Sequence, residues 1–202
     1  LNLKKAINQG RLPGPRMYVT SPYLEGPGAF TFQMNELDGP EDAIRFVQYW
    51  AAEGVDDFKV YTRIRRNELE AAVKEIHRLG KKVTAHLCSI TFREAIELGI
   101  DNLEHGLLVS TDFVPGKKPD FCPSSQDVRL SLLNLEISSP QVQALIRELV
   151  KNKVAITSTL PVFEISVPGR PPLDPRVLEA MAPELRILYL TQRTRVAEMK
   201  NS

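Results

Sequence analysis

The sequence has 202 residues, of which 43% are hydrophobic and 25% are charged, a composition typical of a folded globular chain. Its 26 basic and 25 acidic side chains leave a formal net charge of +1, which argues against a dedicated nucleic-acid-binding protein, because such proteins usually carry a basic excess. No apolar run approaches the roughly 18 residues that a membrane-spanning helix needs, so we expect one large or two small domains and no membrane partner.

The first part of the chain predicts a helix over residues 1–9 and a strand over 16–20. A second helix begins at Pro40, which suits a first helical turn, and stops at Gly54. The short apolar run at 57–61 then predicts a strand.

Helix and strand continue to alternate in the middle of the chain. Apolar residues at helical spacing end at Gly80 and are followed by a predicted strand over 82–86. A third helix ends at Gly99, and residues 100–105 predict the next strand. Repeated units of this kind indicate a parallel sheet with helical crossovers.

Two segments rich in proline interrupt the last part of the chain. We interpret residues 110–137 as an irregular insertion and residues 161–175 as a long surface loop. Between them, a helix from Pro140 and a strand over 154–158 continue the pattern, and a final helix is predicted over 176–199. Five predicted strands and this length suit an open doubly wound sheet, whereas a closed (β/α)8 barrel needs eight strands and about 250 residues.

Sequence motifs exclude several classes of protein. The chain has no GxGxxG, Walker, HExxH or GxSxG motif, so no Rossmann, P-loop, zincin or serine-hydrolase interpretation is supported. Cys88 and Cys122 are too few for a disulfide framework and too far apart for a CxxC pair, so we expect two reduced thiols. Leu1 stands where an initiator methionine would be, and no signal peptide precedes the fold. We therefore expect a piece of a longer protein, whose compartment stays open with the cytoplasm favoured.

Polar side chains lie at the predicted ends of three strands. His86 and His105 end consecutive strands, and Lys59 lies near the end of the strand before them. In a parallel barrel such strand ends form the active-site face, and this placement favours the barrel over the open sheet. Two imidazoles and a third polar group can supply part of a metal site, although structural histidines explain the pattern equally well. Lys59 would reach the rim, pair with a carboxylate such as Glu104, or be chemically modified. His77 lies in a helix and is expected to face solvent.

Four blocks of the sequence resemble the amidohydrolase superfamily, and in particular its imidazolonepropionase-like, prolidase-related branch. The blocks are GRLPGPR at 10–16, FKVY at 58–61, HRLGKKVTAH at 77–86 and LEHG at 103–106. The resemblance implies that residues 1–202 form an incomplete (β/α)8 barrel domain of the TIM type, roughly strands three to seven. It further implies a hydrolase that cleaves C–N bonds of a small cyclic amide, N-acyl amino acid or dipeptide by metal-activated water.

The same resemblance implies roles for individual residues. One or two divalent metals, usually zinc, would be bound by His86, His105 and a carboxylated Lys59, while Tyr61 and Arg63 would contact substrate. The family's His-x-His motif does not occur in the chain, and no residue matches the catalytic aspartate of strand eight, so no catalytic residue is assigned. The alternatives are a non-catalytic α/β domain and a degenerate barrel. A partial barrel also predicts a homo-oligomer formed through its exposed edges.

Overall fold

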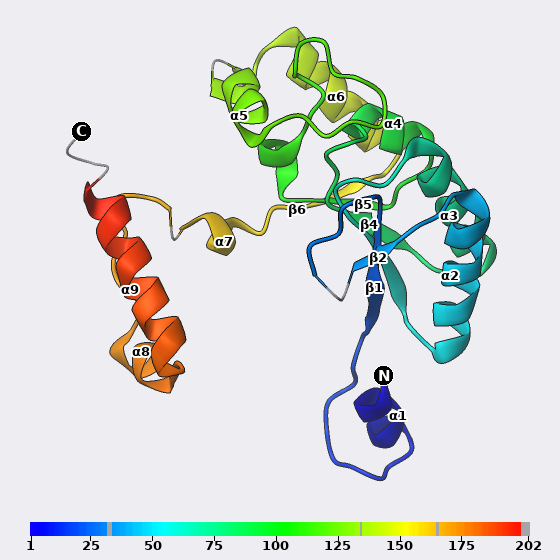
Figure 1. Ribbon diagram of the computed structural model, residues 1–202, viewed down its shortest axis with the longest axis horizontal. Coiled ribbons are helices and arrows are strands. Elements are labelled where there is room, and N and C mark those ends of the chain that lie inside the picture. The colour runs from blue at the N-terminus through cyan, green and yellow to red at the C-terminus, as the bar shows by residue number, and fades with distance from the viewer. Residues whose placement is uncertain (32–33, 134, 165, 199–202) are drawn as a thin grey trace. The chain divides into compact units, whose positions relative to one another are not determined.

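The computed structural model describes residues 1–31, 34–133, 135–164 and 166–198 (Figure 1). Its chain divides into two compact units, Leu1–Ser158 and Thr159–Ser202. In the described part of the larger unit, six parallel strands form one sheet in the order β2-β1-β3-β4-β5-β6. The strands are β1 (Thr20–Glu25), β2 (Met34–Glu36), β3 (Asp57–Val60), β4 (Val83–Ala85), β5 (Asn102–Glu104) and β6 (Ala155–Thr157).

Helices connect these strands as the βα pattern predicts. In the larger unit they are α1 (Asn2–Asn8), α2 (Pro40–Glu53), α3 (Arg66–Arg78), α4 (Phe92–Glu97), the 3-10 helix η1 (Gly106–Val109), α5 (Ser125–Leu133) and α6 (Pro140–Lys151). The smaller unit holds α7 (Leu160–Glu164), α8 (Pro175–Ala180) and α9 (Pro183–Glu198). No helix in the described ranges is both long and apolar enough to cross a membrane.

The core lies where the middle of the sheet meets the helices that follow its strands. Phe58 and Val60 of β3 are fully buried, as are Leu69 and Ile76 on one face of α3. Helices α2 and α3 pack side by side against the sheet (Figure 1). The apolar spacing of 3 and 4 residues that predicts these helices therefore also selects the faces that are buried. The predicted α/β fold with parallel strands is confirmed.

Four predictions about elements differ from the structure. The first strand runs over Thr20–Glu25 instead of 16–20, although it contains Pro22, which cannot donate a ladder hydrogen bond. The pairing of β1 with β3 shifts register between Thr20 and Tyr23, and the Ser21 hydroxyl accepts a hydrogen bond from the Lys59 backbone N–H at 3.2 Å. This irregularity accommodates the proline inside a paired strand.

The other three differences concern β2, the insertion and the last predicted helix. Strand β2 was not predicted, since three residues are too few to show a period, and the segment at 110–137 contains helix α5. The predicted helix over 176–199 is two helices, because Pro183 starts α9 and disfavours a helical residue before it.

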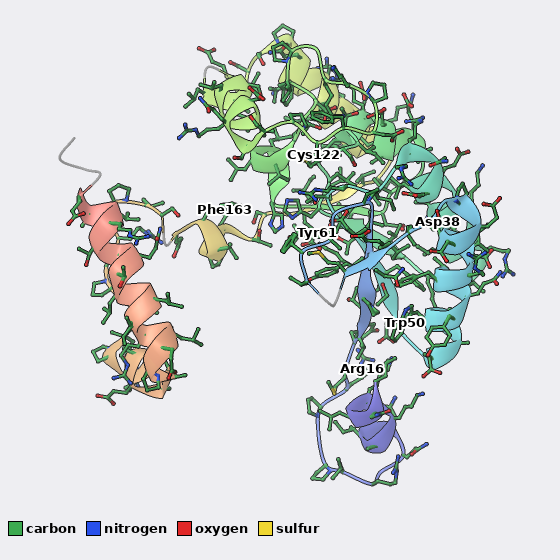
Figure 2. All side chains as sticks on the ribbon, in the orientation of Figure 1. Arg16, Asp38, Trp50, Tyr61, Cys122 and Phe163 are labelled. Atoms are coloured by element: carbon green, nitrogen blue, oxygen red, sulfur yellow. A yellow bond between two sulfur atoms is a disulfide. The ribbon has the colours of Figure 1, made fainter. Side chains whose placement is uncertain are left out.

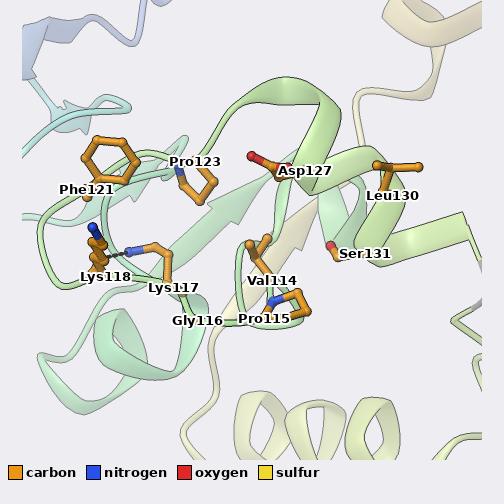
Figure 3. Close-up of a pocket in the computed structure, with 10 residues that line it drawn as sticks. All are labelled: Val114, Pro115, Gly116, Lys117, Lys118, Phe121, Pro123, Asp127, Leu130 and Ser131. Carbon is orange, nitrogen blue, oxygen red and sulfur yellow. Dashed lines mark hydrogen bonds between the residues drawn. The ribbon is translucent and has the colours of Figure 1, made fainter.

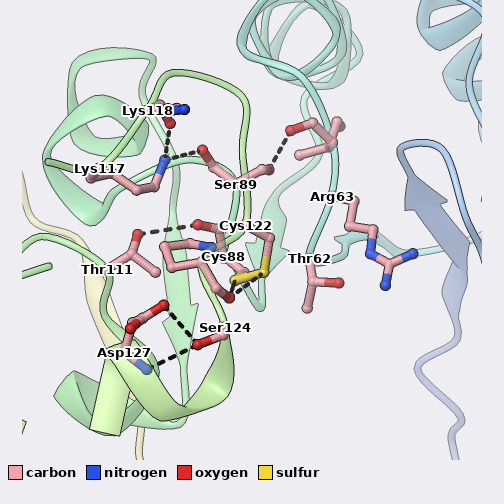
Figure 4. The surroundings of a disulfide bond; sticks show 12 residues. Thr62, Arg63, Cys88, Ser89, Thr111, Lys117, Lys118, Cys122, Ser124 and Asp127 are labelled. Carbon is pink, nitrogen blue, oxygen red and sulfur yellow. Dashed lines mark hydrogen bonds between the residues drawn. A yellow bond between two sulfur atoms is a disulfide. The ribbon is translucent and has the colours of Figure 1, made fainter. Parts of the chain in front are cut away.

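The prediction of two reduced thiols is also wrong, because Cys88 and Cys122 form a disulfide with their Cα atoms 4.8 Å apart (Figure 4). The insertion folds back over the loop that follows β4. Two hydrogen bonds hold the same contact: Thr111 Oγ1 donates to the Cys88 carbonyl at 3.2 Å, and Lys117 Nζ donates to the Ser89 carbonyl at 2.5 Å. A separation of 34 residues in sequence carries no information about this approach.

Candidate functional site

The strand ends bring together the residues that the sequence singled out. Val60 of β3 is paired with Ala85 of β4, which is paired with Leu103 of β5. Tyr61 and His86 directly follow these paired residues, so they lie together at the carboxyl end of the sheet. Figure 2 shows Tyr61 beside these strands. The ring of His86 lies 5.0 Å from that of Tyr61 between centroids.

The two histidines are in direct contact. The centroids of the His86 and His105 rings are 4.4 Å apart, and the rings meet edge to face. His105 has a backbone φ of 67°, in the left-handed region, where histidine is one of the few enriched residue types. Its backbone N–H donates to the Thr157 carbonyl at 2.6 Å. The turn between β5 and η1 thus aims its side chain toward His86.

Burial keeps both imidazoles neutral. The pKa of His86 is lowered to about 4, mainly by burial and secondarily by His105 and Lys59, while Glu104 opposes the shift. Burial likewise lowers the pKa of His105. At pH 7 both rings therefore carry a nitrogen lone pair, which is the form of histidine that binds metals.

Lys59 is paired with Glu104, one of the three states that the sequence left open. Its Nζ lies 2.7 Å from Glu104 Oε1, and its side chain is only 9% exposed. Burial lowers the pKa of Lys59, although the hydrogen bond to Glu104 opposes this effect. Burial alone would raise the pKa of Glu104, but hydrogen bonds from Lys59 and from Thr84 Oγ1, which donates at 2.8 Å, bring it below its usual value. The two side chains therefore form a largely buried ion pair.

This donor set fits a metal only in part. Within the described ranges, no group of three or more His, Cys, Asp and Glu residues is placed to hold a metal ion. His86 and His105 suit two positions of a zinc site, which usually has four ligands. Lys59 is suited to a third position only as a carbamate, because its ammonium has no lone pair to offer.

Aromatic rings form a wall beside the histidines. Tyr61 stacks on Tyr23 of β1 with ring centroids 5.0 Å apart, and Phe30 lies 6.2 Å from Tyr61. Burial is the main cause of a raised pKa at Tyr61, so its hydroxyl is a hydrogen-bond donor at neutral pH. The sequence-based prediction missed Tyr23 and Phe30, because it ended the first strand at residue 20 and so placed neither residue near the strand ends.

Arg63 supports the neighbouring loop. Its guanidinium donates to the Gly28 carbonyl at 2.6 Å, and its backbone N–H donates to Glu25 Oε1 at 2.5 Å. Glu25 is 1% exposed and accepts two further hydrogen bonds, from the Gly26 N–H at 2.9 Å and from Thr62 Oγ1 at 3.2 Å. Glu25 is a third residue that the sequence-based prediction missed because it misplaced the first strand. His77 is exposed, as expected, and contacts Asp101 at 2.9 Å.

The insertion encloses a cavity of about 490 Å³ that is separate from these residues (Figure 3). Its lining includes Lys117, Phe121 and Asp127 but none of the histidines at the strand ends. The ammonium of Lys117 is occupied by the carbonyls of Ser89 and Lys118. This cavity is therefore not part of the candidate site.

No protein-family model matches the sequence, and neither does any curated protein. Among solved structures, a bottromycin amidohydrolase aligns with a TM-score of 0.55 and 20% identity over 96% of this chain and 41% of that chain. An uncharacterized protein aligns with a TM-score of 0.53 and 16% identity, over 98% and 47% of the two chains. A Xaa-Pro dipeptidase with bound methionine aligns with a TM-score of 0.42 and 20% identity, over 78% and 51%.

The two matches with TM-scores above 0.5 establish the fold. The strand order of the first five strands also occurs in open doubly wound sheets, so strand order alone does not identify a barrel. The match to an amidohydrolase structure decides the question, and the predicted resemblance and partial barrel are confirmed as a likeness of fold. The chain spans about half or less of the solved structures that it matches. The sheet contains β2 in addition to the five predicted strands.

Proposed function

We propose that this chain belongs to a metal-dependent hydrolase that cleaves a C–N bond of a small amide: a cyclic amide, an N-acyl amino acid or a dipeptide. One observation carries the proposal. His86 and His105, with their rings 4.4 Å apart, leave adjacent strand ends of a sheet that has the fold of about half an amidohydrolase chain. In parallel barrels this end of the sheet is the active-site face.

The proposed division of roles follows from the residues' chemistry. The neutral rings of His86 and His105 would bind a divalent metal, most often zinc in such a site. The bound metal would supply Lewis-acid activation of water and of the amide carbonyl at neutral pH. The chain's own part is to hold the two rings in contact and partly buried, which the turn at His105 and the packing of Tyr61 on His86 accomplish.

Lys59 has two mutually exclusive states in this proposal. As an ammonium it forms the ion pair with Glu104 over 2.7 Å. As a carbamate it would be an anion facing the Glu104 carboxylate, and the two groups would repel each other. Carboxylation of Lys59 therefore requires Glu104 to turn away or to take up a proton.

Substrate contacts are assigned to the aromatic wall and its neighbours. The Tyr61 hydroxyl stays protonated and suits a carbonyl or carboxylate of the substrate as a donor. For Arg63 to contact substrate, its guanidinium would exchange the Gly28 carbonyl for an oxygen of the substrate. Arg63 also positions the loop after β1, so its substitution would affect both functions.

Metal content tests the proposal directly. The chain is equilibrated with Zn²⁺, dialysed, and measured by elemental analysis as wild type, His86→Ala and His105→Ala. His77→Ala is the control, because His77 is exposed and away from the strand ends. Near-stoichiometric zinc in the wild type and in His77→Ala, lost in the other two variants, is the expected result. A wild type that retains no more zinc than His86→Ala would overturn the metal site.

The second candidate is a non-catalytic α/β domain with structural histidines. The ion pair between Lys59 and Glu104 favours it, because this pair satisfies both charges without a metal. Zinc bound equally by all four proteins, or by none of them, would favour this alternative. In the full-length protein, release of free amino acid from N-acyl amino acids would exclude it.

A further inference from the structure

A cavity of about 610 Å³ lies directly beside the candidate site and includes His86 in its wall. One side is the loop after β4, with Leu87 and Cys88, and the other sides are η1 and α5. We call it the α5 pocket. Its volume falls within the range of roughly 300–1,000 Å³ that is common for small-molecule sites. It is distinct from the cavity drawn in Figure 3, although α5 contributes to both.

The wall of the α5 pocket is mostly apolar. Leu108 and Val109 of η1 face it, as do Val128, Leu132 and Leu133 of α5. Helix α5 buries none of its residues in the core, and three of its apolar side chains line this pocket. Leu108 is 54% exposed and Leu133 is 65% exposed. An apolar ligand would remove this surface from water, which is the main source of affinity in such sites.

The lining of the α5 pocket contains one residue with a formal charge. Arg129 of α5 lines the pocket, and among the described lining residues there is no Asp or Glu. Within the described part of the chain, Arg129 has neither an ion-pair nor a hydrogen-bond partner. A planar guanidinium that is free in this way is suited to bind a carboxylate through two parallel hydrogen bonds. The disulfide between Cys88 and Cys122, which both line the pocket, fixes two of its walls relative to each other.

We propose that the α5 pocket binds the apolar part of an amide substrate whose free carboxylate is held by Arg129. Among the classes of substrate considered above, this selects an N-acyl amino acid or dipeptide with an aliphatic or aromatic side chain over a cyclic amide. The substrate's place in the reaction rests on the proposed hydrolase function. Binding of the apolar carboxylate itself does not depend on a metal.

Calorimetry with a defined pair of probes tests this assignment. N-Hexanoyl-L-leucine carries the carboxylate, and N-hexanoyl-L-leucinamide is its neutral analogue. Both are titrated at pH 7 into the wild type, Arg129→Gln and Arg147→Gln. Arg147 is a matched control, because it is an exposed arginine on α6 that does not line the pocket. We expect the acid to bind the wild type at least about tenfold more tightly than the amide, since a hydrogen bond to a charged group is worth about that factor.

Each variant has its own expected result. Arg129→Gln should lose the preference for the acid while still binding the amide, and Arg147→Gln should behave like the wild type. Leu132→Asp should weaken both probes, and its circular dichroism melting curve shows whether it remains folded. Equal binding of acid and amide by the wild type, or unchanged binding by Arg129→Gln, would overturn the pocket assignment. Because no metal is added, a failure here leaves the zinc measurement unaffected, and a failure of the zinc measurement leaves this result standing.

Discussion

Loss of the Cys88–Cys122 disulfide should lower the free energy of unfolding of the larger unit. The bond joins residues separated by 34 positions, so it restricts the unfolded chain considerably. For a loop of that length, the entropy of loop closure corresponds to about 4 kcal/mol at 25 °C. The folded state should change little, because the hydrogen bonds from Thr111 and Lys117 still hold the loop after β4 against the insertion.

Urea unfolding of the wild type and of the Cys88→Ser/Cys122→Ser double variant measures this difference. Trp50 on α2 is the single tryptophan of the chain, so its fluorescence reports on the larger unit alone (Figure 2). With a slope of about 2 kcal/mol per molar urea, the midpoint should fall by about 2 M. Dithiothreitol should shift the wild type by the same amount and leave the double variant unchanged. Two thiols reacting with Ellman's reagent in the untreated protein, or equal midpoints for both proteins, would refute the reasoning.

Four other outcomes follow from the structure. Gly26→Ala should cost about 3 kcal/mol of stability, since its Cβ would lie 1.8 Å from the Arg63 carbonyl oxygen, a backbone atom; an unchanged urea midpoint would contradict this. Glu104→Gln should cost about 3 kcal/mol at pH 7 by leaving the buried Lys59 ammonium unpaired, and the cost should shrink as the pH is raised, because burial lowers the pKa of Lys59. The pKa of His86 is about 4 in the folded protein and near 6.5 when unfolded, so only the unfolded chain gains this proton between those values. The metal-free wild type should therefore lose stability relative to His86→Gln as the pH falls from 6.5 to 4, and parallel urea midpoints across this range would count against the buried ring. Strands β2 and β6 are the edges of the described sheet, so self-association that rises with concentration is expected in light scattering, and a strict monomer at high concentration would argue against open edges.

Local sequence patterns were sufficient to predict the helices and strands in the middle of the chain. The apolar spacing that predicts α2 and α3, together with the glycines that end them, places β3, β4 and β5 within a few residues of their observed bounds. The carboxyl ends of parallel strands lie on the same side of a sheet. The predicted positions of β4 and β5 were therefore enough to predict that His86 and His105 lie together.

The predicted bounds of the first strand were wrong because contacts between residues far apart in the sequence outweighed the local preference of proline. Pro22 disfavours a paired strand, but the register shift beside β3 and the Ser21 hydroxyl accommodate it. Moving that strand by four residues carries Tyr23 and Glu25 to the strand ends, where no sequence pattern had placed them. The length of β2 is too short for any periodicity to be visible.

The sequence by itself determined the alternation of strand and helix and the convergence of two histidines, because both depend on hydrophobic periods shorter than ten residues. Only the tertiary structure decided which of three states Lys59 adopts, that Cys88 is bonded to Cys122, and that α5 turns its apolar side chains toward His86. The ion pair depends on the placement of β3 beside β4 and β5, and the other two outcomes depend on how the insertion folds back over the loop after β4. That geometry is set by packing between segments far apart in the chain, about which residue spacing carries no information.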